Sequence, residues 1–353
     1  MPEPHEPGSF LKDTLDGQPK ELARLVSDRH RAERAAERLH GCRRVFITGT
    51  GTSFHGALVG QFMLRSAGVD AWAVRAFEFA NYPPALHDDD GLIVLSHRGS
   101  KRFSRQSLDA FAAGSDRWIA ITGEGSTMQG DGVIHTVPQE GSSVHTASHT
   151  GAMLRLAQIA SALGRPAWRS QVADLPEAVD VALRWSDQVQ ADVRDIELGS
   201  LVHFIGGGPA RATALEGALK LREATHSISA EGHDVEGVLH GPLVSIQAGQ
   251  TVVLVAQPGP SLDRMTEVAR ALTEVGATIL IAGAAADELA GAEGVSATDG
   301  YEVPEVDEVL APIVNVIPLQ LLAYHASRKT GVDADSFRKD EARYSAAQSK
   351  FSL

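Results

Sequence analysis

Short apolar runs alternate with longer segments of helical spacing along most of this chain. The runs lie at 43–47, 72–74, 92–95, 118–121 and 134–137, and again at 201–205, 251–255 and 278–281. Helical spacing covers 18–38, 177–196, 263–275 and 311–328. Short, continuous apolar runs are typical of strands that are buried on both faces, and the helices between them would cover those faces. The pattern therefore predicts an α/β fold with parallel sheets flanked by helices.

The strand-and-helix pattern occurs twice. Residues 203–208 (His-Phe-Ile-Gly-Gly-Gly) resemble residues 45–50 (Val-Phe-Ile-Thr-Gly-Thr), and further strands follow both segments. Two prolines and a shift in composition at 164–176 indicate a domain boundary. We predict a helical arm at 1–40, a first domain at 41–165, a second domain at 176–331 and a charged tail at 332–353. Two similar halves indicate a duplicated domain with pseudo-twofold symmetry.

The chain is acidic, and this limits its partners. Among 353 residues, 32 Lys and Arg face 45 Asp and Glu, for a net charge of −13. This balance argues against a nucleic-acid partner or an anionic membrane surface. The single cysteine, Cys42, excludes an intramolecular disulfide and a multi-cysteine metal site. With a polar N-terminus and no run of about 18 apolar residues, we expect a cytoplasmic protein without a membrane segment.

Three of the predicted strands end in turns that are rich in glycine, serine and threonine. The turns lie at 48–57, 96–104 and 140–150. Hydroxyls and backbone N–H groups bind phosphate without net charge, and ligands of parallel sheets bind at the carboxyl ends of the strands. The first turn is neither a P-loop, since no Gly-Lys-Ser/Thr follows, nor a dinucleotide fingerprint, since no acidic residue closes the next strand. The turns together predict a pocket for an anion.

A fourth glycine turn, 206–208, leads into a helix that carries Glu216, Lys220 and Glu223. Free N–H groups and the helix dipole favour an anion at the start of such a helix. Positions i, i+4 and i+7 form one stripe along it. The combination suggests acid–base chemistry on a phosphorylated small molecule, although a solvated ladder of ordinary ion pairs has the same spacing.

Five stretches carry a resemblance to a known family. They are 51–53 (Gly-Thr-Ser), 95–99 (Leu-Ser followed by Gly99), 214–223 (Ala-Leu-Glu-Gly-Ala-Leu-Lys-Leu-Arg-Glu), 239–242 (Leu-His-Gly-Pro) and 318–325 (Pro-Leu-Gln-Leu-Leu-Ala-Tyr-His). They resemble proteins with two sugar-isomerase (SIS) domains, and in particular the isomerase module of glucosamine-6-phosphate synthase. The resemblance implies two flavodoxin-like αβα sandwiches, each a parallel sheet flanked by helices, and a homodimer.

The resemblance also implies roles for individual residues. In that family the Thr-Ser turn and the Ser-rich loop hold the phosphate of the substrate. The position matching Glu223 is the base that moves a proton between C1 and C2. The position matching His240 assists ring opening and comes from the neighbouring subunit. The candidate substrate-binding residues are Thr50, Gly51, Thr52, Ser53, Ser96, His97, Arg98, Ser100, Lys101, Ser143, His145, Thr146 and Lys220. An enediol route needs a carboxylate and an acid, so we expect no metal and no other cofactor.

The phosphate loop departs from the family pattern. His97 and Arg98 stand where the family has Gln-Ser, and Lys101 stands where it has Thr. These cations either strengthen phosphate binding or accept another anion, such as a sulfonate or carboxylate. In the third turn, His145 replaces a serine of the family, and it contacts either the substrate or its own loop.

The C-terminal catalytic lysine of the family has no direct counterpart. An ungapped extension of the match past Arg338 puts Ala342 at that position. Lys350 would take the role if an inserted helix brings it back, and the tail is then expected to pack near the active site.

The predicted function is a phosphosugar aldose–ketose isomerase acting on a hexose phosphate or amino-hexose phosphate. Residues before Arg43 are too few for the glutamine-hydrolysing domain and include no N-terminal cysteine, so we expect no glutamine-dependent amination. One alternative is a deaminase of the glucosamine-6-phosphate type. Another is a non-catalytic sugar-phosphate-binding protein. The presence of both Glu223 and His240 favours an enzyme.

Overall fold

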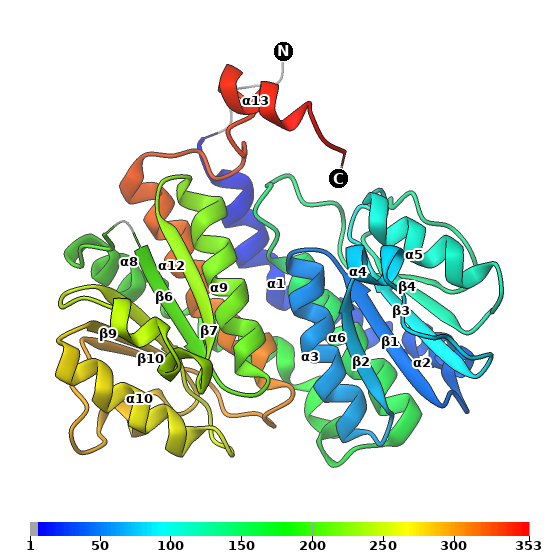
Figure 1. Ribbon diagram of the computed structural model, residues 1–353, viewed down its shortest axis with the longest axis horizontal. Coiled ribbons are helices and arrows are strands. Elements are labelled where there is room, and N and C mark those ends of the chain that lie inside the picture. Colours follow the sequence, from blue (N-terminus) through cyan, green and yellow to red (C-terminus); the bar gives the residue numbers. More distant parts are fainter. Residues whose placement is uncertain (1–5, 200, 353) are drawn as a thin grey trace. The chain divides into compact units, whose positions relative to one another are not determined.

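The computed structural model describes residues 6–199 and 201–352, which divide into two compact units with one sheet each (Figure 1). The first-sheet unit holds Gly17–Glu140, His145–Pro176 and the described residues from Arg338 onward. The second-sheet unit holds the described residues up to Asp16, Gly141–Val144 and Glu177–Phe337. Each unit is therefore assembled from three separate segments of the chain.

The first sheet has five parallel strands in the order β2-β1-β3-β4-β5. Their bounds are β1 (Arg44–Gly49), β2 (Ala71–Arg75), β3 (Asp90–Leu95), β4 (Trp118–Thr122) and β5 (Val133–His135). All six residues of the central strand β3 are buried, and the apolar run 92–95 predicts this for the last four.

Helices cover the first sheet in two groups. The helices of this unit are α2 (His30–Ala36), α3 (Thr52–Ser66), α4 (Ala76–Asn81), α5 (Arg102–Ala112), α6 (Ala147–Gly164) and α13 (Ala342–Gln348), with 3₁₀ turns η1 (Glu37–Leu39) and η2 (Ala167–Ala173). Helix α6 packs against α3 and α2, whereas α4 packs against α5. Helix α1 (Ser9–Ser27) begins in the second-sheet unit and ends in this one.

The second sheet repeats the topology of the first. Its order β10-β9-β8-β6-β7 has the first strand between the second and third, as in the first sheet. The strands are β6 (Leu201–Gly206), β7 (Ser229–Asp234), β8 (Thr251–Val255), β9 (Thr278–Gly283) and β10 (Asp299–Glu302). The 2-1-3-4-5 order is that of flavodoxin-like sheets, so the predicted fold class is confirmed.

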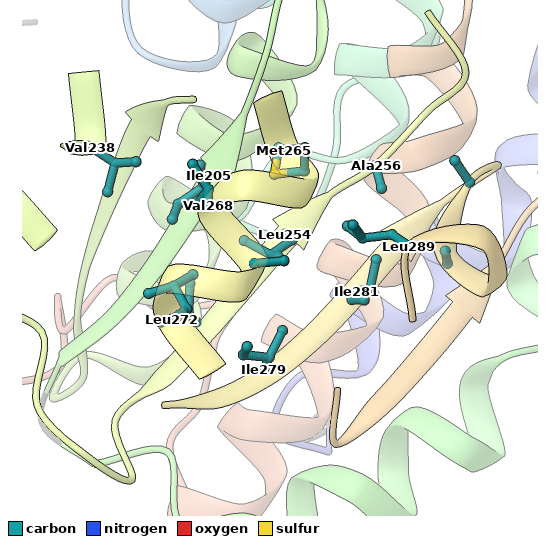
Figure 2. Close-up of a cluster of buried hydrophobic side chains, with 14 of the residues drawn as sticks. Ile205, Val238, Leu254, Ala256, Met265, Val268, Leu272, Ile279, Ile281 and Leu289 are labelled. Atoms are coloured by element: carbon teal, nitrogen blue, oxygen red, sulfur yellow. The ribbon is translucent and has the colours of Figure 1, made fainter. Parts of the chain in front are cut away.

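The helices of the second-sheet unit also lie in two groups. Helices α7 (Leu175–Leu183), α8 (Ser186–Asp195), α9 (Ala210–Thr225), α10 (Leu262–Val275), α11 (Ala286–Ala290) and α12 (Ala311–Thr330) accompany η3 (Gly237–Leu239) and η4 (Pro242–Ser245). Helix α12 packs against α9 and α8. Figure 2 shows the core on the α10 side, where Leu254 and Ile281 of the sheet meet Met265 and Leu272.

Two predicted helices are each divided in the structure. The segment 18–38 contains the end of α1 and then α2. Between the two helices, the buried Arg155 donates hydrogen bonds to the carbonyl and carboxylate oxygens of Asp28 at 3.2 and 3.0 Å. The segment 177–196 contains α7 and α8, which are separated at Trp185, whose indole N–H donates to Glu302 O.

Strands β7 and β10 were not predicted from the sequence. Both lie at sheet edges, and neither contains an apolar run. Among residues 6–199 and 201–352, no helix combines the length and the hydrophobicity that crossing a membrane requires.

Gly217 allows α9 to lie close to the second sheet, and it provides a test of this packing. A Cβ at Gly217 would lie 2.5 Å from Leu319 Cδ2 and 2.9 Å from the ring of Phe204. We expect Gly217→Val to lower the free energy of unfolding by about 1–3 kcal/mol through overpacking. Calorimetric unfolding of the purified protein measures the change.

Gly17 in α1 is the matched control. A Cβ there would meet no atom within 4 Å, and alanine has the higher helix propensity. Gly17→Ala should therefore leave stability unchanged or raise it by up to about 1 kcal/mol. Equal melting temperatures for Gly217→Val and the wild type would contradict the close approach of α9.

Candidate functional site

The turn after β1 leads directly into α3. Gly51 has a φ of +57°, and its carbonyl accepts hydrogen bonds from Phe54 N at 2.8 Å and His55 N at 3.1 Å. Thr50 and Gly51 are exposed, while Thr52 and Ser53 are half-buried in the first turn of the helix. The four predicted ligands of this turn thus lie together at the start of a helix, where an anion is favoured.

The turn after β3 combines buried hydroxyls with exposed cations. Ser96 is 3% exposed, and its Oγ makes no hydrogen bond within residues 6–199 and 201–352. Gly99 has a φ of +70°, and a Cβ there would lie 2.1 Å from Ser126 Oγ, so the close turn requires glycine. Arg98 and Ser100 are exposed at the rim of the turn. The Oγ of Ser104, in the first turn of α5, is another buried hydroxyl without a partner in the described chain.

Glu140 is a buried carboxylate that the sequence analysis did not single out. Its oxygens accept hydrogen bonds from Thr146 N at 2.9 Å and Ser148 N at 2.8 Å, at the start of α6. Burial alone would raise the pKa of Glu140, but the His145 imidazole, the hydrogen bond from Ser148 and the nearby His97 lower it to about 2. Glu140 is therefore ionised at neutral pH and caps α6.

His97 and His145 lie on either side of this carboxylate. His97 Nε2 accepts a hydrogen bond from the backbone N–H of Glu140 at 3.4 Å. His145 Nδ1 lies 3.6 Å from Glu140 Oε1. The two imidazole rings meet edge to face, with centroids 5.2 Å apart. Burial lowers the pKa of His97 to about 4, so this imidazole is neutral at pH 7. Of the predicted third-turn residues, His145 and Thr146 belong to this unit, whereas Ser143 belongs to the second-sheet unit.

In the second-sheet unit, a tight glycine turn joins β6 to α9. A Cβ at Gly206 would lie 2.2 Å from Ala210 O, and Gly208 has a φ of +54°. Only residues without a Cβ allow the strand to turn so closely into the helix.

Lys220 lies between two carboxylates on α9. Its Nζ is 3.3 Å from Glu216 Oε1 and 2.5 Å from Glu223 Oε2. Glu216 and Lys220 are 0% and 1% exposed in their side chains, whereas Glu223 is 19% exposed. The stripe is therefore a buried ion-pair ladder rather than a solvated one, and Glu223 is the member that solvent reaches.

His240 is an exposed residue between η3 and η4. Its side chain is 71% exposed, and Nε2 lies 2.8 Å from Glu236 Oε1, which belongs to the same loop. Neither a hydrogen bond nor an ion pair joins His240 to Glu223 in the described chain. The following Gly241 has a φ of +136° and Val244 is 87% exposed. This loop thus presents an imidazole and an apolar side chain to its surroundings.

Lys350 follows α13 in the first-sheet unit and is exposed. Ala342, the position given by an ungapped match, is the first residue of α13. The structure thus groups the turn residues before Glu140, together with His145, Thr146 and Lys350, in the first-sheet unit. It groups Ser143, Lys220, Glu223 and His240 in the second-sheet unit.

The buried ladder predicts a large effect of Lys220→Met on stability. Removing the ammonium takes the compensating charge away from Glu216, which is fully buried, so we expect a loss of about 3–5 kcal/mol in the free energy of unfolding. Chemical denaturation followed by circular dichroism measures this loss.

Glu223→Gln is the matched control for the ladder. Glu223→Gln should lower the free energy of unfolding clearly less than Lys220→Met, because Glu223 is partly exposed and Lys220 keeps its contact with Glu216. A loss for Lys220→Met no larger than that for Glu223→Gln would show that the ladder contributes little.

Comparison with known proteins finds a family match for most of the second-sheet unit. Residues 201–328 match the SIS domain family. The chain is 30% identical over 344 residues to the isomerizing glutamine–fructose-6-phosphate aminotransferase of Methanothermobacter thermautotrophicus, covering 95% of this chain and 55% of that protein. The chain thus spans about half the length of this relative.

Two solved structures share the fold. The C-terminal domain of glucosamine-fructose-6-phosphate aminotransferase from Francisella tularensis gives a TM-score of 0.79 at 20% identity, covering 92% of this chain and 98% of that one. The tagatose-6-phosphate ketose/aldose isomerase of Escherichia coli gives 0.79 at 18% identity, covering 95% and 98%. Residues 201–328 therefore form a SIS domain, and the chain is homologous to the isomerase (SIS) module of the glutamine–fructose-6-phosphate aminotransferases.

Proposed function

We propose that this chain is a phosphosugar aldose–ketose isomerase that acts on a hexose phosphate or amino-hexose phosphate. The observation that carries the proposal is the ladder on α9 in a chain homologous to isomerizing enzymes. Glu216 and Lys220 are fully buried, and Glu223 is the carboxylate that remains accessible beside a fixed ammonium. A single accessible carboxylate is what a proton transfer between adjacent carbons requires.

The proposed reaction is a proton shuttle through an enediol. Glu223 removes the proton from C2 of the open-chain aldose, and the electron pair forms the C1–C2 double bond while O1 gains a proton. Glu223 then returns a proton to C1, and O2 loses its proton to form the ketose. His240 assists the preceding ring opening by moving a proton between the ring oxygen and O1, since an imidazole exchanges protons near neutral pH.

The phosphate of the substrate would be bound by hydroxyls, amides and cations of the first-sheet unit. Thr50–Ser53 and Ser96–Lys101 provide these groups at the carboxyl ends of β1 and β3. The unpartnered Oγ of Ser96 supports this assignment, because a buried hydroxyl without a partner is costly unless a ligand satisfies it. Lys350 remains the candidate for the C-terminal catalytic lysine. Lys220, expected from the sequence to bind substrate, is 1% exposed, so we assign it to holding Glu223.

We further propose a cytoplasmic homodimer in which His240 serves the site of the partner protomer. The exposure of His240 and Val244 supports this role, since an isolated chain leaves both side chains in solvent. The cytoplasm is the compartment in which charged sugar phosphates are retained, because they do not cross membranes unaided.

Glu223→Gln tests the base. We expect exchange with deuterated water, of the C1 proton of fructose 6-phosphate or of the C2 proton of glucosamine 6-phosphate, to fall by about 10²–10⁴-fold, while ligand binding is retained. Nuclear magnetic resonance follows the exchange, and a thermal-shift assay follows binding.

Glu274→Gln, an exposed carboxylate on α10, is the control and should exchange at the wild-type rate. Near-normal exchange by Glu223→Gln would refute the base assignment. Release of ammonia from glucosamine 6-phosphate would favour a deaminase, and binding without exchange by the wild type would favour a non-catalytic binding protein.

Mixed dimers test the origin of His240. If His240 acts across the interface, a heterodimer of Glu223→Gln and His240→Ala chains contains one intact site and one doubly altered site. Random mixing of the two inactive proteins should then restore about a quarter of wild-type activity. If His240 acts within its own chain, every site lacks one group and mixing restores no activity, which would refute the proposed arrangement.

A further inference from the structure

Three side chains of the first-sheet unit meet around one point. His97, Glu140 and His145 each offer a ligand atom, and these atoms lie within 4.8 Å of one another. His97 follows β3, and the other two residues lie in the turn that precedes α6. Glu140 and the facing imidazole nitrogen of His145 are shielded from solvent. Two imidazoles and a buried carboxylate thus converge on one point.

We propose that His97, Glu140 and His145 form a binding site for a divalent transition-metal ion, with Zn²⁺ as the best match. Zinc binds imidazole nitrogen and carboxylate oxygen at about 2.0–2.2 Å, so neighbouring ligand atoms of a tetrahedral site lie roughly 3.3–3.5 Å apart. His145 Nδ1 and Glu140 Oε1 are 3.6 Å apart, close to this separation. His97 offers the third ligand atom, within 4.8 Å of the other two.

The surroundings of Glu140 suit a metal ligand. Its two oxygens are held by the N–H groups of Thr146 and Ser148, which fix the orientation of the carboxylate. Each carboxylate oxygen has a second lone pair, so these bonds leave acceptor capacity for an ion. The Nδ1 of His145 is buried and makes no hydrogen bond within the described residues. Three protein ligands leave a fourth coordination position open.

The second-sheet unit contains a similar group that serves as a comparison. His203, Glu231 and His233 also lie within 4.8 Å of one another. There, however, the imidazoles share a hydrogen bond of 3.1 Å, and the Glu231 side chain is 57% exposed. The two facing nitrogens are already partnered with each other and the carboxylate is solvated, so this group lacks the buried, fixed carboxylate of the first.

The proposed metal site goes beyond the proposed isomerase function and does not depend on it, since the enediol route uses no metal. The test therefore measures binding without substrate. Chelator-treated protein is titrated with Zn²⁺ alone in a calorimeter and against a chromophoric competitor. We expect one ion per chain for the wild type. Co²⁺ in its place should give visible absorption bands typical of nitrogen and oxygen ligands.

Matched variants locate the ion. His97→Ala and His145→Ala should each weaken Zn²⁺ binding by at least about tenfold and abolish the cobalt bands. The exposed His87, in the same unit, is the control, and His87→Ala should bind like the wild type. His233→Ala, from the comparison group, should also leave binding unchanged.

Two results would overturn the proposal. One is a wild-type protein that takes up no stoichiometric Zn²⁺, which would leave His145 and Glu140 as neighbouring side chains without a shared ion. The other is loss of binding in His233→Ala with retention in His145→Ala. If an alanine variant fails to fold by circular dichroism, His145→Gln replaces it, and X-ray absorption of the wild-type zinc complex counts the imidazole ligands directly. Fewer than two would refute the site.

Discussion

The burial of Lys220 between two carboxylates constrains the second-sheet unit. A lysine that is 1% exposed cannot remain charged in an apolar interior without compensation, because desolvation of an ammonium costs several kcal/mol. Glu216 and Glu223 supply the compensation from the same helix, at i−4 and i+3, so the ion pairs are buried together with α9. Gly217, next to Glu216, lets the helix approach Phe204 and Leu319. The packing that holds α9 against its sheet therefore also orients the accessible carboxylate of Glu223.

The two units share a strand order but carry different chemistry at their strand ends. In the second unit, the turn after β6 is built of glycine, and its charges lie along the helix that follows. In the first unit, hydroxyls, imidazoles and a capping carboxylate lie in the turns themselves. The duplicated scaffold thus carries the proposed proton-transfer group in one unit and the proposed anion-binding groups in the other, because loops at strand ends can vary while the sheet is kept.

The sequence predicted the central strands because burial on both faces demands continuous apolar residues. Edge strands have no such demand, and for this reason β7, with its Ser-Ala-Glu-Gly-His-Asp sequence, was missed. The ladder on α9 followed from helical spacing, but its burial did not, since spacing says nothing about what covers a helix face. Glu140 was also missed. Its role depends on N–H groups six and eight residues away, in a turn whose conformation local sequence does not determine.

The charge of Glu140 offers a physical reason why the turn after β3 carries a histidine at position 97. A buried carboxylate whose backbone N–H is 3.4 Å from His97 places a negative charge beside a turn that is proposed to bind an anion. Such a site works only if this charge is compensated locally, because the chain as a whole carries a net charge of −13 and repels anions. The two N–H groups of α6 stabilise the carboxylate, but they do not remove its charge. A metal ion held by His97 and His145, as proposed above, would do so. Histidine at position 97, where the resemblance leads us to expect glutamine, therefore meets one requirement, which is to hold an ion that balances the charge of Glu140.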